Sequence, residues 1–182
     1  MKRFMRNVAV GIVALLAGAA VCGASGNIED ASAPRTPILS TEISGSDLAF
    51  FSGASRQMAL LAQLSELAKK RAVTPEVQAE AATVWKEQTD AAARLKELAT
   101  LKHVPLENEL DEQGKVVLQT LGKMNGVRFD KSFLDAQGDA QDVLEASLEA
   151  GAGSSDDTIK ALAEAEMGML KEERERVRKL GL

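Results

Sequence analysis

Residues 73–99, VTPEVQAEAATVWKEQTDAAARLKELA, carry the pattern that decides the fold class. Apolar side chains recur there at a spacing of three and four, with one amide in the middle of the stripe: Val77, Ala81, Val84, Gln88, Ala91, Leu95 and Leu98. This spacing places them all on one face of an α-helix. Thr74 followed by Pro75 is typical of a helix start, because proline lacks an N–H that the first turn would leave unpaired. The stretch predicts an amphipathic helix from Pro75 to about residues 101–103.

Two more long helices are predicted on either side of this one. The first takes Ser46 as its N-cap, ends near Arg71 and has an apolar face made of Phe51, Ala54, Met58, Leu61, Ser65 and Ala68. Another runs from about Val127 to Ala150, with a stripe made of Phe129, Phe133, Ala136, Ala140 and Leu144. Near its start, Asp130 favours the positive end of the helix dipole. The phenylalanines and Trp85 are expected in the core.

The last long helix is predicted to follow Ser155 as its cap, with basic residues at its C-terminal end. Its stripe is Ile159, Leu162, Glu166, Met169, Leu170, Glu173, Val177 and Leu180. A shorter apolar segment, with Leu110, Val117, Leu118 and Leu121, lies between the second and third long helices. Four long amphipathic helices with short links predict an all-α protein, a four-helix bundle with one additional short helix.

The N-terminus has the three parts of a secretory signal peptide. Lys2, Arg3 and Arg6 precede an uncharged run over residues 8–21, and small residues follow. Residues 1–24 are therefore expected to be cleaved, which predicts a periplasmic or secreted protein. The alternative is a lipoprotein anchored at Cys22, although the branched Val before this cysteine fits a lipoprotein signal poorly. The proline- and serine-containing residues 25–45 are predicted to be a flexible linker, and residues 46–182 the helical-bundle domain.

The mature chain would have no cysteine and a strongly acidic charge. The only cysteine leaves with residues 1–24, so no disulfide could support the fold. The loss of three basic residues leaves 19 of the 22 Lys and Arg residues against 27 Asp and Glu, a net charge of −8. A nucleic acid or an anionic membrane requires a concentrated basic surface. Neither is expected as a partner, and only a lipid at Cys22 would hold the mature domain to a membrane.

No set of residues in the sequence matches a known catalytic constellation. The chain has one histidine and no tyrosine. His103, at the predicted end of the second helix, is expected to be a surface or capping residue rather than a ligand. The Glu-x-x-His spacing that carries the metal ligands of many four-helix bundles does not occur. We therefore expect no enzymatic activity and no cofactor.

The polar residues on the predicted inner stripes are the candidate site: Gln88, Gln137, Gln141, Glu166 and Glu173. Three interpretations are open. The side chains could lie at the edge of each stripe and reach water. They could instead meet in a hydrogen-bonded layer that fixes the helix register, because buried polar groups need partners. Glu166 and Glu173 could also hold a hard metal ion, although other ligands are lacking.

Residues 126–137, GVRFDKSFLDAQ, resemble the Gly-x-x-Phe-Asp-(+)-x-Tyr-Leu-x-x-Gln signature of the domain of unknown function 4142 family. Phe133 replaces the usual tyrosine, and the matching residues are Gly126, Phe129, Asp130, Lys131, Leu134 and Gln137. The resemblance covers about residues 46–180, with further similarity in 73–99 and in LKEERERVRKL at 170–180. Members are exported bacterial proteins with a ferritin-like fold, which the resemblance implies for this chain.

The same resemblance bears on the candidate site. Members of the family usually carry a histidine in each of three helices, and the resemblance aligns Gln88, Gln141 and Glu173 with those positions. An amide cannot act as a general base and is a poor ligand for a transition metal. The resemblance therefore implies that any metal binding by relatives is lost or changed here.

Together these observations predict a non-enzymatic, exported helical-bundle protein of the bacterial envelope, and the resemblance implies a link to stress. Two alternatives stay open. One is a degenerate ferritin-like metal-binding protein that uses Glu166 and Glu173. The other is an interaction module in which an exposed apolar stripe docks a partner helix.

Overall fold

The computed structural model describes residues 43–107 and 109–180, and this part of the chain is helical apart from its turns and loops. It contains four long helices and one short one: α1 (Gly45–Arg71), α2 (Pro75–Leu101), α3 (Glu112–Gly122), α4 (Gly126–Ala152) and α5 (Asp157–Lys179). All five helices predicted from the apolar periods are present. The expected signal peptide and nearly all of the expected linker lie outside the described residues.

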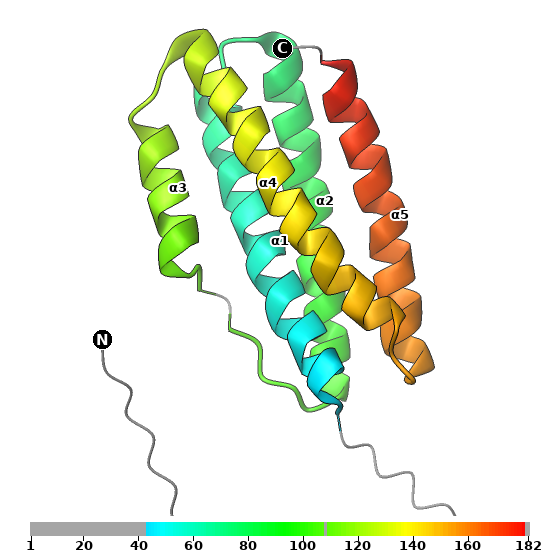
Figure 1. Cartoon of the computed structure of the whole chain (residues 1–182). Coiled ribbons are helices and arrows are strands. Elements are labelled where there is room, and N and C mark those ends of the chain that lie inside the picture. Colours follow the sequence, from blue (N-terminus) through cyan, green and yellow to red (C-terminus); the bar gives the residue numbers. More distant parts are fainter. Residues whose placement is uncertain (1–42, 108, 181–182) are drawn as a thin grey trace, which may run out of the picture. The chain divides into compact units, whose positions relative to one another are not determined.

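The helices form an all-α bundle with one long crossover connection (Figure 1). α1 and α2 form an antiparallel pair, as do α4 and α5. The segment between α2 and α4 runs back along the whole bundle and contains α3, so α2 and α4 point the same way. A single long crossover is the connectivity of ferritin-like bundles. The predicted fold class, including the additional short helix, is confirmed.

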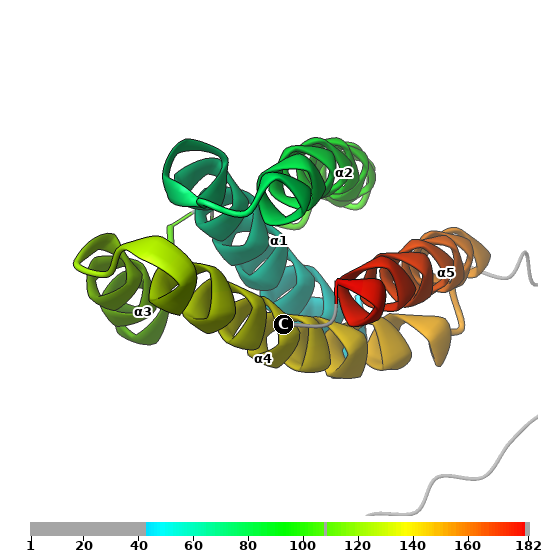
Figure 2. The same ribbon diagram turned by 90° about the horizontal axis from the view of Figure 1, so that it is seen from above.

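Apolar packing is unevenly distributed around the bundle. α1 packs along both α2 and α4, and α4 packs along α5, whereas α2 and α5 come close over a much smaller area (Figure 2). The core falls into two clusters. One is centred on Phe50, Phe51, Leu61 and Leu148, and the other on Leu64, Phe129 and Phe133. The predicted apolar stripe of α1 is buried along its whole length.

Two predicted helix caps are wrong by one or two residues. α1 is capped by Ser44 rather than Ser46, because Ser44 forms a reciprocal capping box with Asp47. α5 is capped by Asp156 rather than Ser155, and the Asp156 carboxylate accepts hydrogen bonds from the backbone N–H groups of the first turn. A carboxylate also interacts favourably with the positive end of a helix, which explains why it caps in place of the hydroxyl.

The turn between α1 and α2 is held by a side chain of α4. Asp130 is fully buried, and its two carboxylate oxygens accept the backbone N–H groups of Val73 (3.1 Å) and Thr74 (2.8 Å). The prediction that Asp130 serves the dipole of its own helix is therefore wrong: it lies beyond the first turn of α4 and holds the turn that precedes α2. Thr74 is the N-cap residue of α2 as predicted, but its own side chain makes no capping bond.

His103 ends α2 through its backbone. Its φ of 57° is left-handed, and the N–H groups of His103 and Val104 donate to the carbonyls of Thr100 and Ala99. This is the Schellman arrangement, which pairs carbonyls that the last helical turn leaves free. The side chain is exposed, in agreement with the expected surface position.

Trp85 is not a core residue, contrary to prediction. It is 37% exposed, and the Lys69 ammonium lies 3.8 Å from the centre of its ring. The residue follows Val84 of the buried stripe, and one step along a helix turns a side chain by about 100°. Trp85 therefore lies on the flank of α2, where a cation–π contact with α1 covers one face of the indole.

Among the described residues, no helix combines the length and the apolar character needed to cross a bilayer.

Candidate functional site

Three glutamine amides surround the carboxylate of Glu173 inside the bundle. The Nε2 atoms of Gln137 and Gln141 donate to Glu173 Oε1 at 2.9 and 2.7 Å, and Gln88 Nε2 donates to Oε2 at 2.9 Å. We call these four residues the amide layer. α2, α4 and α5 each contribute to it, so it links the three helices at one level of the bundle.

The helix periods place these side chains. Gln88 occupies the middle of the α2 stripe, and Glu173 lies three residues after Leu170 on the buried face of α5. Gln137 and Gln141 are four residues apart on α4, which sets them on the same face one turn from each other. This spacing explains how both amides reach the same carboxylate oxygen.

The amide layer is closed to solvent. The exposed fractions are 5% for Gln88, 0% for Gln137, 2% for Gln141 and 1% for Glu173. Of the three interpretations left open, the one in which the side chains lie at the edge of their stripes and reach water is therefore wrong for these four residues. Burial raises the pKa of Glu173, whereas the three amide hydrogen bonds favour its ionised form and partly oppose that rise.

Two amide oxygens of the layer have no partner. Gln88 Oε1 and Gln137 Oε1 are buried and accept no hydrogen bond from the described residues. A cavity of about 10 Å3 lies beside Gln88, Glu166 and Glu173, and its other lining residues are mainly apolar. Its size is close to that of a single water, and the polar side chains of its wall could hold one. The layer therefore has spare hydrogen-bond acceptors next to its single carboxylate.

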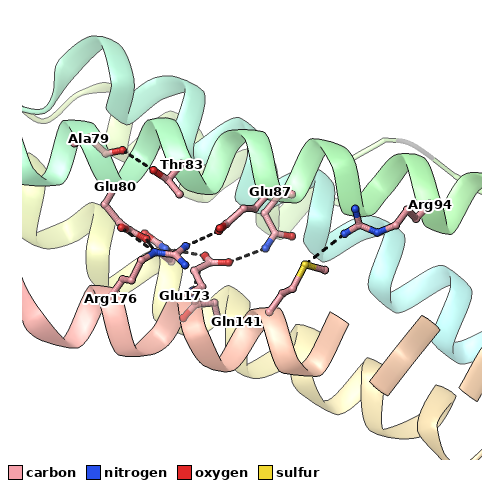
Figure 3. A network of polar contacts seen from close by, with 11 residues as sticks. Ala79, Glu80, Thr83, Glu87, Arg94, Gln141, Glu173 and Arg176 are labelled. Atoms are coloured by element: carbon pink, nitrogen blue, oxygen red, sulfur yellow. Dashed lines mark hydrogen bonds and ion pairs between the residues drawn. The ribbon is translucent and has the colours of Figure 1, made fainter. Parts of the chain in front are cut away.

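Ion pairs flank the amide layer along the α2–α5 contact. On one side, the Arg176 guanidinium lies between Glu80, at 3.1 Å, and Glu87, at 2.5 Å (Figure 3). On the other side, Arg94 binds both oxygens of Glu166, at 2.8 and 3.2 Å. Burial also raises the pKa of Glu80, and the Arg176 charge opposes that rise. We call this row of contacts, from Arg176 to Arg94, the polar seam.

The structure thus separates the candidate residues into two groups. Gln88, Gln137, Gln141 and Glu173 meet in one layer, whereas Glu166 is buried beside the same small cavity and pairs with Arg94. The sequence did not identify Arg94, Arg176 or Glu80 as residues of the site. Nothing in the apolar periods marks them, because their partners are more than 70 residues away along the chain.

The layer fits a ferritin-like metal poorly. Within the part of the chain that the structure describes, no group of three or more His, Cys, Asp or Glu side chains is arranged to hold a metal ion. Glu173 is the only carboxylate in the layer, and the amides direct N–H groups toward it. A di-iron or di-manganese centre needs several carboxylates and histidine nitrogens, so the donor set is wrong for that chemistry.

Comparison with known proteins identifies the family. Searches of curated proteins and of solved structures give no match. A family model described as "Domain of unknown function (DUF4142)" matches residues 33–180, which is most of the chain. The chain therefore belongs to the DUF4142 family.

Proposed function

We propose that this protein is a non-enzymatic helical-bundle protein of the bacterial envelope that is exported through residues 1–24 and acts during envelope stress. In this proposal the amide layer is a structural element that sets how α2, α4 and α5 pack. The stress role and the export rest on the family resemblance and on the pattern of the first 24 residues. The non-enzymatic role rests on the layer itself.

The observation that carries the structural role is the closure of the layer by its own side chains. Both oxygens of Glu173 accept hydrogen bonds from glutamines, and the residue is 1% exposed. A catalytic acid or base must come within hydrogen-bond reach of a substrate. The adjoining cavity has a volume of about 10 Å3, too small for a molecule larger than water.

A hydrogen-bonded layer of this kind favours one helix register over others. The three amides reach the carboxylate only when α2, α4 and α5 are aligned at this level. A shift of one helix by a turn would bury unpaired polar groups, each at a cost of roughly 1–3 kcal/mol. The layer therefore supports a role in conformational specificity, a role that buried polar groups play in other helical assemblies.

Complementation in the source bacterium tests the stress role and the structural role together. We expect a strain without the native gene to survive envelope stress poorly, and a Glu173→Gln copy to restore survival as well as the wild type. An amide keeps the shape of the side chain but cannot act as an acid or base. A Glu173→Gln protein that is folded but does not restore survival would contradict the structural role. A deletion strain with normal survival would contradict the stress role.

Export is tested by the mass of the protein recovered from the periplasmic, membrane and cytoplasmic fractions of an expressing cell. Cleavage as proposed leaves residues 25–182. A chain that begins at Cys22 and carries acyl groups would show the lipoprotein alternative, and a full-length cytoplasmic chain would contradict export.

The metal-binding alternative is tested on the mature chain purified without chelator or histidine tag. The donor set of the amide layer favours little bound metal and no change in Tm on addition of iron, manganese or zinc. A near-stoichiometric metal whose effect on Tm disappears in Glu173→Ala would replace the proposed structural role by a metal centre.

A further inference from the structure

The crossover helix α3 is fastened to the bundle mainly at its two ends. Before it, Ser55 Oγ of α1 donates to the Glu107 carbonyl at 3.2 Å. After it, Arg71 of α1 donates to the Met124 carbonyl at 3.1 Å and to Asn125 Oδ1 at 2.7 Å. Between these points α3 buries only Gly114 and Leu121. The helix therefore spans the bundle surface without filling the space beneath its first turns.

A hollow of about 380 Å3 lies under this part of α3, against α1 and α4. Its volume falls within the range of pockets that bind small molecules. The apolar part of its wall is contributed by Leu60, Val117, Ala136, Ala140 and Val143. Val143 is 51% exposed, although it is a large apolar side chain. A ligand with an apolar body would cover it.

The charged part of the wall has more negative than positive groups. It contains Arg56, Asp111 and Asp139. Asp111 Oδ1 accepts the Gly114 N–H at 2.8 Å, and its Oδ2 lies 3.9 Å from Arg56 Nη1, with both side chains 40% exposed or more. Asp139 also lines the hollow and is exposed, and no hydrogen bond or ion pair joins its carboxylate to another residue in the part of the chain that the structure describes. One carboxylate therefore stands at the hollow without a cation.

We propose that this hollow is a binding site for a small amphipathic cation, a molecule with a short apolar body and one ammonium group. The apolar body lies against Leu60, Ala136 and Val143, and the ammonium lies near Asp139. Charge complementarity favours a positively charged ligand, because an anion would meet two carboxylates and only one guanidinium. This site is separate from the amide layer and does not depend on the function proposed for it.

Three probes separate the contributions that the apolar body and the charge of the ligand make to binding. Octyltrimethylammonium has both, octanoate has a similar chain with the opposite charge, and tetramethylammonium has the head group alone. The backbone N–H signals of Gly53 and Gly114 report on the hollow in a nitrogen–proton correlation spectrum, since both residues line it. Gly168 of α5 lies outside it and serves as the control. We expect octyltrimethylammonium, below its micelle concentration, to shift the first two signals and not the third.

Two variants test the residues. Asp139→Asn should weaken octyltrimethylammonium binding roughly two- to five-fold, the size expected for one exposed charge contact. Asp135→Asn, which removes an exposed carboxylate of α4 one turn away and outside the hollow, should weaken binding less than Asp139→Asn does. Ala136→Leu should fill the hollow and abolish binding. Octanoate binding as tightly as octyltrimethylammonium, equal effects of the two Asp variants, or no shift at Gly53 and Gly114 would overturn the proposal.

Discussion

Two contacts of the bundle, α1 with its neighbours and α2 with α5, are built from different interactions. The buried face of α1 is mostly apolar and includes Phe50, Phe51 and Leu61. The polar seam instead joins α2 to α5 through Arg176, Glu173 and Arg94. Apolar burial stabilises a fold without specifying direction or offset, whereas hydrogen bonds and ion pairs form at one offset only. The difference assigns stability mainly to α1 and register mainly to the seam.

The order of the seam contacts supports this division. Along α2 the residues Glu80, Gln88 and Arg94 pair with positions 176, 173 and 166 of α5. The residue number on α5 therefore falls as the residue number on α2 rises. Antiparallel neighbours require this order. Three contacts at successive levels would all be lost if α5 moved by one turn.

The largest effect is expected in the apolar contact. Phe51 is fully buried in the cluster around α1, and Phe51→Ala should lower the free energy of unfolding by about 3–5 kcal/mol, because a large side chain is replaced by a cavity. Chemical denaturation measures this directly. Leu101→Ala is the control, since Leu101 is 70% exposed and its truncation should change stability by less than about 0.5 kcal/mol. Similar losses in the two variants would contradict the assignment of stability to α1.

A smaller loss is expected when the centre of the amide layer becomes apolar. Glu173→Leu leaves the Nε2 groups of three buried glutamines without their acceptor, and we expect a loss of about 1–3 kcal/mol. The loss is limited because the substitution also removes a buried charge, which is itself costly. A variant that unfolds at a higher denaturant concentration than the wild type would show that the hydrogen bonds of the layer contribute nothing net.

Removal of one cation from the seam should have a smaller effect again. Arg176→Met leaves the largely buried Glu80 without its partner, and a loss of about 1–2 kcal/mol is expected. Lys86→Met is the matched control: it breaks the Lys86–Asp90 pair, whose side chains are 74% and 50% exposed, and should give no measurable change. Equal losses would mean that the burial of the seam has no energetic consequence.

The helices could be predicted from the sequence, and the seam could not, for a physical reason. A three-four apolar period specifies a helix and its inner face without reference to any other helix, as in residues 73–99. The exposure of Gln141, at the edge of such a face, depends on how close α5 lies to α4. The sequence of one helix does not determine that distance. The same holds for Arg94 and Glu166, whose pairing depends on the offset between two helices.

Local signals were sufficient where they were complete. Ser44-x-x-Asp47 is a capping-box pattern within four residues of sequence, and it marks the start of α1 without reference to any other helix. Asp130 is the opposite case. Its carboxylate caps the turn before α2, more than 50 residues earlier in the chain, so its role follows from the packing of α4 against that turn.

The most direct test of the structural role of the amide layer is the stability of Glu173→Gln against that of the wild type between pH 4.5 and pH 8. Burial raises the folded-state pKa of Glu173 above the ordinary value of a glutamate, so between the unfolded-state and folded-state pKa values the folded protein binds more protons than the unfolded chain. Its contribution to stability therefore falls as the pH rises through the folded pKa. A glutamine at position 173 does not titrate, so it makes no pH-dependent contribution to stability. Its N–H groups can donate to the unpaired oxygens of Gln88 and Gln137.

We predict that Glu173→Gln is at least as stable as the wild type at pH 7 and that its advantage grows from pH 4.5 to pH 8. The difference between the two proteins isolates Glu173, because all other titrating groups are shared. A Glu173→Gln variant that loses as much stability as Glu173→Leu, or a difference that does not change with pH, would contradict the account of a buried carboxylate held by three amides.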